Sequence, residues 1–129
     1  MVNNQFRTIK IGLVDDHRLF KSGMKVVFSY YSHFQVVLDA NNGQELIEKL
    51  KYDQPDLIML DLIMPVMGGL EVLQFMRSHY PRMKVIVLSL YNDLALIDEV
   101  KKMGAWCFLS KMEPPFRMVE EIQNCIKET

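Results

Sequence analysis

Five short apolar runs alternate with longer amphipathic stretches in this 129-residue chain, and this alternation constrains the fold more than any other feature. The runs are rich in Val, Ile and Leu, and turns containing Gly, Pro or Asn separate them from the stretches. Runs this short and this apolar are typical of strands buried on both faces, as in a parallel sheet. The predicted strands cover Ile9–Val14, Phe34–Leu38, Leu57–Leu60, Val85–Leu88 and Cys107–Leu109.

The amphipathic stretches carry apolar residues at helical spacing, which predicts a helix after each strand. Asn42 is expected to cap the second helix, with Glu45 as its capping-box partner, and Gly104 is expected just beyond the end of the fourth. The stripes expected to face the core are Leu19, Phe20, Gly23, Met24 and Val27; Leu46, Ile47 and Leu50; Leu70, Leu73, Met76 and Tyr80; Leu94, Ile97, Val100 and Met103; and Pro115, Met118, Val119, Ile122 and Ile126.

Strict alternation of strand and helix predicts an α/β fold, a doubly wound five-stranded parallel sheet with helices on both faces. The length suits one domain. Fifteen Lys and Arg against sixteen Asp and Glu give a net charge of −1, so no global positive field exists to hold nucleic acid or an anionic membrane. The chain has no membrane-length apolar run and no signal-peptide core, and its two cysteines are too few for a disulfide framework. A cytoplasmic protein is expected.

Polar residues stand where the predicted strands end. Asp15 and Asp16 follow the first strand, Asp61 follows the third and Ser89 the fourth, while Lys111 comes shortly after the fifth. Doubly wound sheets bind ligands at the carboxyl ends of their strands, so these five side chains are expected to converge at one edge.

This set of side chains predicts phosphoryl chemistry. Three adjacent carboxylates repel each other unless a cation joins them, and Mg²⁺ prefers oxygen ligands of this kind. Lys111 and Ser89 are then suited to bind the remaining oxygens of a phosphoryl group. One carboxylate is left to act as a nucleophile that forms an aspartyl phosphate.

Four segments together resemble the signatures of bacterial response-regulator receiver domains: VDDH at 14–17, LDLIMPVMGG at 60–69, VLSL at 87–90 and GAWCFLSK at 104–111. The resemblance extends from Thr8 to Lys127 and implies a flavodoxin-like (βα)5 fold with strand order 2-1-3-4-5. The segment VDDHRLFKSGM also resembles the NarL/FixJ group, whose receivers precede a LuxR-type helix-turn-helix.

The resemblance implies a magnesium site. Asp16 and Asp61 would bind Mg²⁺ directly, Asp15 would act largely through a bound water, and the backbone carbonyl of Ile63 would supply a further ligand. His17, next to this set, is interpreted as a solvated or helix-capping side chain, with metal ligation as the alternative.

The resemblance also implies a phosphorylation switch. Asp61 would accept the phosphoryl group from the phosphohistidine of a sensor histidine kinase, and Lys111 and Ser89 would bind it. Ser89 and Phe108 would be the switch residues. The receiver would assist its own phosphorylation and dephosphorylation without being a conventional enzyme, and phosphorylation would drive homodimerisation and control a transcription regulator.

Residues 7–129 are expected to form the receiver and residues 1–6 a short leader. No LuxR-type DNA-binding domain is expected within these residues, so an excised receiver is favoured over a stand-alone regulator. DNA contact would then be made only through the missing domain.

Some positions depart from the family pattern. Leu90 stands where a small residue is usual and is expected to slow access to the site, and Met112 replaces the proline that often follows the lysine. Ile63 and Tyr91 are bulky at positions that modulate hydrolysis, which predicts a long-lived phosphorylated form.

Other functions are less consistent with the sequence. A phosphatase of the haloacid-dehalogenase type needs a second aspartate two residues after the nucleophile, where Ile63 stands. A flavin site needs a phosphate-binding loop after the first strand, where Asp15 and Asp16 would repel the phosphate. A docking module that works without phosphorylation remains an alternative.

Overall fold

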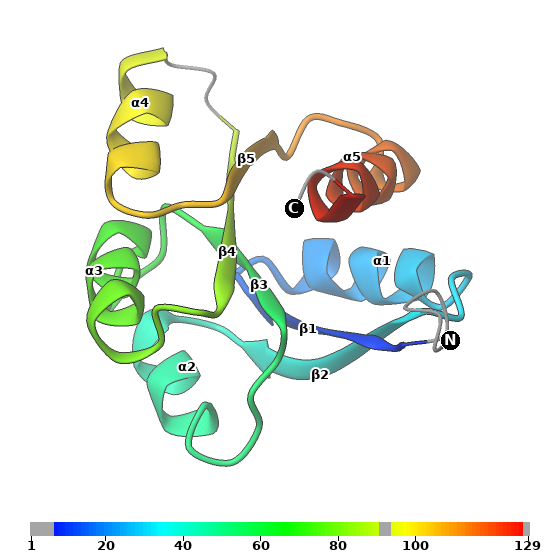
Figure 1. Ribbon diagram of the computed structural model, residues 1–129, viewed down its shortest axis with the longest axis horizontal. Coiled ribbons are helices and arrows are strands. Elements are labelled where there is room, and N and C mark those ends of the chain that lie inside the picture. Colours follow the sequence, from blue (N-terminus) through cyan, green and yellow to red (C-terminus); the bar gives the residue numbers. More distant parts are fainter. Residues whose placement is uncertain (1–6, 91–93, 128–129) are drawn as a thin grey trace.

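The computed structural model describes residues 7–90 and 94–127, so the expected leader at 1–6 and Tyr91 lie outside the described residues. Strands and helices alternate through the whole described chain (Figure 1). The elements are β1 (Ile9–Val14), α1 (Arg18–Phe28), β2 (Phe34–Ala40), α2 (Gly43–Lys49), β3 (Leu57–Asp61), α3 (Gly69–His79), β4 (Lys84–Ser89), α4 (Leu94–Lys102), β5 (Cys107–Ser110) and α5 (Pro115–Lys127).

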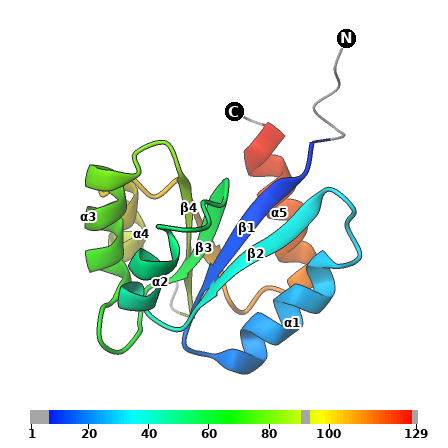
Figure 2. The same cartoon turned by 90° about the horizontal axis from the view of Figure 1, so that it is seen from below.

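The five strands form one parallel sheet in the order β2-β1-β3-β4-β5, which confirms the predicted fold class and strand order. Helices α1 and α5 cover one face, and α2, α3 and α4 cover the other (Figure 2). The strand order reverses at β1, because β2 lies on one side of it and β3 on the other. Val14 at the end of β1 pairs with Leu60 of β3, so the two strands end side by side.

The core has one layer on each face of the sheet. Strand β3 shows the alternation directly, since Ile58 and Leu60 pack towards α2, α3 and α4 while Leu57 and Met59 pack towards α1 and α5. All five residues of β3 are buried, including Asp61 at its end. This burial of both faces explains why the strand reads as a continuous apolar run.

Five residues of the predicted stripes are exposed and therefore wrong as core positions: Leu19, Gly23, Leu70, Leu94 and Pro115. Leu19 is 87% exposed and Leu94 is 82% exposed, both close to the start of their helices. On α1 the buried positions are instead Lys21, Met24, Val27 and Phe28. Apolar spacing therefore located the helix but misassigned one turn of its buried face.

The predicted Asn42 cap and the predicted glycine after α4 are confirmed, while the side chain of Glu45, expected as the capping-box partner, contacts Asn41 and Lys49. The side chain of Asn42 accepts a hydrogen bond of 2.9 Å from the backbone N–H of Glu45 at the start of α2. Gly104 follows α4 with a φ of 103°, a left-handed conformation in which glycine has no steric penalty.

In the loop between Asp61 and α3, the β-branched residue Val66 also has a left-handed backbone conformation, with a φ of 70°.

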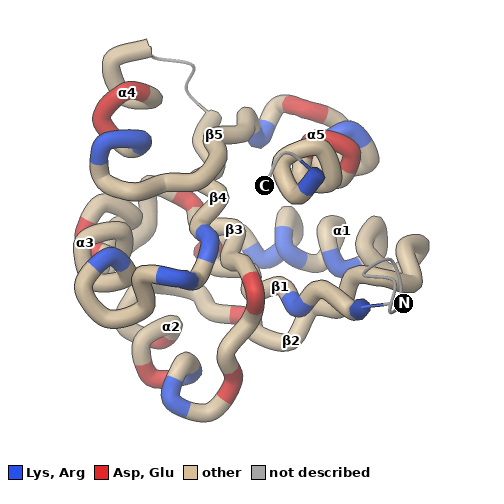
Figure 3. Tube along the Cα trace, viewed as in Figure 1, with Lys and Arg blue, Asp and Glu red and all other residues tan. Residues whose placement is uncertain are grey.

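Charged residues of both signs are interspersed over the fold (Figure 3). In the described ranges 7–90 and 94–127, none of the helices combines the length and the apolar character needed to cross a membrane.

Candidate functional site

The carboxyl ends of three strands bring two carboxylates and an ammonium group together. Asp15 directly follows β1, Asp61 ends β3, and Lys111 directly follows β5. The Nζ atom of Lys111 lies 2.7 Å from Oδ2 of Asp15 and 3.6 Å from Oδ2 of Asp61. Residues far apart in the sequence therefore form one buried charged cluster, because parallel strands end at the same edge of the sheet.

Burial differs among the three acidic residues. Asp15 and Asp61 are 1% and 4% exposed, whereas the side chain of Asp16 is about one third exposed at the rim. Ligand atoms of Asp15, Asp16, His17 and Asp61 all lie within 4.8 Å of one another. These residues therefore fit a single divalent cation that is reached from solvent on the Asp16 side.

Ser89 and Phe108 occupy neighbouring strands beside the acidic cluster. Ser89 is buried at the end of β4, one residue beyond Leu88, which pairs with Asp61. The backbone N–H of Lys111 donates to the Ser89 carbonyl at 2.9 Å, which connects the ends of β4 and β5. Phe108 is half-buried and packs against the core layer on the α2, α3 and α4 side.

Two apolar side chains flank the cluster. Ile63 is 64% exposed, and its backbone N–H donates to Oδ1 of Asp61 at 3.5 Å. Leu90 is 52% exposed. The third residue expected to flank the site, Tyr91, lies outside the described part of the chain.

The site carries an excess of negative charge. Burial and the nearby charge of Asp15 together raise the pKa of Asp61 to about 6, while the charge of Lys111 opposes both effects. Burial and the charge of Asp15 both raise the pKa because loss of water and a nearby like charge each destabilise the ionised carboxylate. A bound divalent cation would reverse this balance, so the electrostatics as well as the oxygen ligands fit Mg²⁺.

The side chain of His17 is not a helix cap. His17 is the N-cap residue of α1, but its side chain makes no capping hydrogen bond. Its Nδ1 atom lies 3.1 Å from Oδ1 of Asp15 and 2.9 Å from Nζ of Lys111. The side chain is 56% exposed, in keeping with the solvated interpretation, while its ring nitrogen faces the acidic cluster, the position that the alternative of metal ligation requires.

Lys21 is a buried residue near the site that was not among the expected site residues. It is 3% exposed, and its ammonium group donates to Asp39 at 2.5 Å, to the Asn41 side chain at 2.6 Å and to the Ala40 carbonyl at 3.2 Å. The Ala40 carbonyl also accepts from the backbone N–H of Asp15 at 3.0 Å. Lys21 therefore fixes α1 to the end of β2 immediately behind the acidic pair.

A spacing signal for Lys21 was present in the sequence. Lys21, Met24 and Phe28 recur at three and four residues, the period of a buried helical stripe. A lysine on such a stripe needs buried partners, and β2 supplies them because it ends in Asp39 and Ala40.

Replacing Lys21 with Met is expected to lower the free energy of unfolding by roughly 2 kcal/mol. Three oxygen atoms would lose their ammonium partner, and one of them belongs to the Asp39 carboxylate, whose charge is only partly screened by water. Lys25→Met is the matched control: Lys25 also pairs with Asp39 but is largely exposed, so its loss should cost less than about 1 kcal/mol. Urea denaturation of both variants measures the difference, and equal effects would contradict the assigned role of Lys21.

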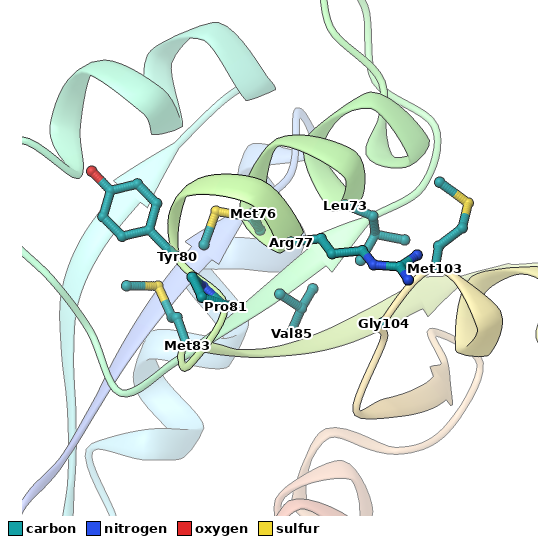
Figure 4. Close-up of a pocket in the computed structure, with 9 residues that line it drawn as sticks. All are labelled: Leu73, Met76, Arg77, Tyr80, Pro81, Met83, Val85, Met103 and Gly104. Carbon is teal, nitrogen blue, oxygen red and sulfur yellow. The ribbon is translucent and has the colours of Figure 1, made fainter.

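A small cavity of about 90 Å³ lies at the opposite end of the sheet from the carboxylates, between α3, the start of β4 and the end of α4 (Figure 4). Among the described residues that line it, Arg77 is the only charged one, and the others are mostly apolar. Its guanidinium donates to the Lys102 carbonyl at 3.4 Å, near the end of α4. The lining residues in the described part of the chain include no nucleophile and no set of metal ligands.

The chain belongs to the family of response regulator receiver domains, whose family model matches residues 11–123. Accepting a phosphoryl group is the general function of this family. Members of the family are signalling domains, and the receivers of two-component regulators have histidine kinases as partners.

Several of the related proteins are transcription regulators of the NarL and DegU type. The chain is 33% identical over 115 residues to the transcriptional regulatory protein DegU of Brevibacillus brevis, covering 89% of this chain and 49% of that protein. It is 30% identical over 118 residues to the chemotaxis protein CheY of Thermotoga maritima, covering 92% of this chain and 98% of CheY.

Solved structures agree with these matches. The signal receiver domain of the response regulator NarL from Mycobacterium tuberculosis superposes with a TM-score of 0.86 at 28% identity, covering 95% of this chain and 99% of that one. The chain spans about half the length of the DegU relative.

Proposed function

We propose that Asp61 is the phosphoacceptor of this receiver and takes its phosphoryl group from the phosphohistidine of a sensor histidine kinase. The observation that carries the proposal is the position of Asp61: a carboxylate buried at the end of the central strand β3, next to Asp15 and Lys111. A buried carboxylate with a raised pKa is costly to keep unless it is used.

The residues that would hold Mg²⁺ are Asp15, Asp16, Asp61 and the backbone carbonyl of Ile63. Bound there, Mg²⁺ offsets negative charge on the phosphoryl oxygens. The support is the oxygen-rich ligand set and its excess negative charge.

The chain's own residues would carry out the transfer. A carboxylate oxygen of Asp61 attacks the phosphorus in line, so that an O–P bond forms as the P–N bond to the donor histidine breaks and the imidazole leaves. Lys111 binds a phosphoryl oxygen through its ammonium group, and Ser89 binds another through its hydroxyl. Asp61 is altered in each turnover, so the receiver assists its own phosphorylation without being a conventional enzyme.

The output would follow from the new charge at Asp61. Ser89 would move to meet the phosphoryl group, and Phe108 would pack into the space that Ser89 leaves. This movement would change the surface of α4, β5 and α5 and promote homodimerisation. By similarity to the NarL and DegU relatives, the dimer would control transcription in the cytoplasm through a LuxR-type DNA-binding domain, with residues 7–129 as the receiver.

Incubation with acetyl phosphate and Mg²⁺ tests this function by intact mass spectrometry. The protein should gain one phosphoryl mass, and the gain should vanish when EDTA is present or when Asp61 is replaced by Asn. Asp56→Asn is the control, since Asp56 precedes β3 at the opposite end and binds Arg7. An Asp61→Asn variant phosphorylated at the wild-type rate would exclude Asp61 as the acceptor.

A further inference from the structure

We propose that His17 is a direct metal ligand through Nδ1, and that the site therefore binds first-row transition-metal cations such as Mn²⁺ and Ni²⁺ more tightly than its carboxylates alone would. The proposal deepens the proposed function and rests on it, since it concerns the same cation site. Nδ1 of His17 would be a nitrogen ligand in a site whose other ligand atoms are oxygens.

The backbone places His17 at the mouth of the site. Its N–H donates to Oδ1 of Asp15 at 2.9 Å, which closes a tight turn between β1 and α1. The same turn directs the side chain towards Asp15 and Lys111 rather than towards the first turn of the helix. The ring is half-exposed, so it borders the cluster on the side open to solvent.

The distances between ligand atoms suit a shared ion. The Nδ1 atom of His17 lies 3.1 Å from Oδ1 of Asp15, 3.9 Å from Oδ1 of Asp16 and 3.9 Å from Oδ2 of Asp61. Two ligand atoms that are each about 2.1 Å from one octahedral ion are separated by about 3 Å when adjacent and about 4.2 Å when opposite. The separation of 3.1 Å matches adjacent ligands, and the two separations of 3.9 Å lie between the adjacent and opposite values, so small side-chain movements would complete the coordination.

The contact with Lys111 indicates which ring nitrogen carries the lone pair. An ammonium group has only donors, so Nζ of Lys111 at 2.9 Å must donate to a lone pair on Nδ1 of His17. The ring proton is then on Nε2. This lone pair is occupied by the Lys111 ammonium group in the metal-free protein, so a bound cation would take the place of that hydrogen bond.

The nitrogen ligand changes the metal preference. Mg²⁺ is a hard ion that favours oxygen, whereas imidazole increases the affinity of a site for first-row transition metals. Removing His17 should therefore weaken the binding of Mn²⁺ and Ni²⁺ selectively. A purely electrostatic or packing role for His17 would change the affinity for Mg²⁺ to the same extent.

Metal titrations of the wild type, His17→Ala and His17→Gln test the selectivity, with isothermal calorimetry for Ni²⁺, Mn²⁺ and Mg²⁺. Both variants should lose about tenfold or more in Ni²⁺ affinity and change Mg²⁺ affinity by less than about threefold. His17→Gln retains a side-chain acceptor for Lys111 but lacks the imidazole nitrogen. His79→Ala, an exposed histidine on α3, is the control for loss of a histidine and should match the wild type.

Electron spin-echo spectroscopy of bound Mn²⁺ gives a second readout that does not depend on affinity. The wild type should show coupling to a directly bound ¹⁴N nucleus, and both His17 variants should lose it. Mn²⁺ bound without nitrogen coupling would overturn the role of His17 while leaving the cation site intact. No binding of any of the three metals by the wild type would instead count against the proposed magnesium site itself.

Discussion

Replacing Gly69 with Ala should lower the free energy of unfolding by roughly 3 kcal/mol, because the new methyl group has no space. A Cβ atom at Gly69 would lie 2.6 Å from Cα of Leu62 and 2.8 Å from the backbone oxygen of Asp61. Both contacts are with backbone, which cannot rotate away. Helix α3 would have to move from the end of β3, where the proposed phosphoacceptor stands.

Gly23→Ala provides the matched control, since no atom lies within 4 Å of the corresponding Cβ on α1. This change should raise stability by about 0.5–1 kcal/mol, because alanine favours the helix more than glycine does. Urea denaturation measures both variants. A Gly69→Ala variant as stable as the wild type would show that the close packing of α3 on the end of β3 is not required.

Replacing Asp61 with Asn should stabilise the metal-free protein by roughly 2 kcal/mol at pH 7.5, with EDTA present. Burial and the charge of Asp15 raise the pKa of Asp61 to about 6, above the ordinary 3.8, so its ionised form opposes folding. This penalty is fully present above pH 6. It declines as the pH falls through 6 towards 3.8, because the carboxyl then becomes protonated in the folded protein.

Denaturation curves of wild type and Asp61→Asn at pH 7.5 and pH 4.5 measure this dependence. The difference in stability between the two proteins should be large at pH 7.5 and much smaller at pH 4.5. Adding Mg²⁺ at pH 7.5 should stabilise the wild type more than the variant, because binding to the folded state adds free energy. A less stable Asp61→Asn variant at pH 7.5 would contradict the electrostatic account of the site.

The sheet was predictable because each strand is buried on both faces. Leu57–Leu60 reads as a continuous apolar run for this reason, and Asp61 at its end marks the edge of the sheet. The same reasoning located Asp15 and Lys111, since parallel strands direct their carboxyl ends to one edge. Strand order depended on the resemblance, because apolar spacing alone does not determine which strands are neighbours.

Side-chain direction was harder to predict than position. Leu19 was expected inside and is exposed, while Lys21 was not expected inside and is buried by its contacts with the end of β2. His17 was assigned to solvent or capping because its position after the acidic pair suits an N-cap. Its ring turns to Lys111, and a contact 94 residues distant in the sequence leaves no local signal.

Chemical identification of the phosphorylated residue shows whether Asp61 is the phosphoacceptor. After incubation with acetyl phosphate and Mg²⁺, borohydride reduces an aspartyl phosphate to homoserine, and peptide mass spectrometry locates the change. The account predicts homoserine at position 61 alone, and none when acetyl phosphate is omitted. Homoserine at position 15 or 16 with Asp61 intact, or a phosphoryl group on a serine, threonine or histidine, would contradict it.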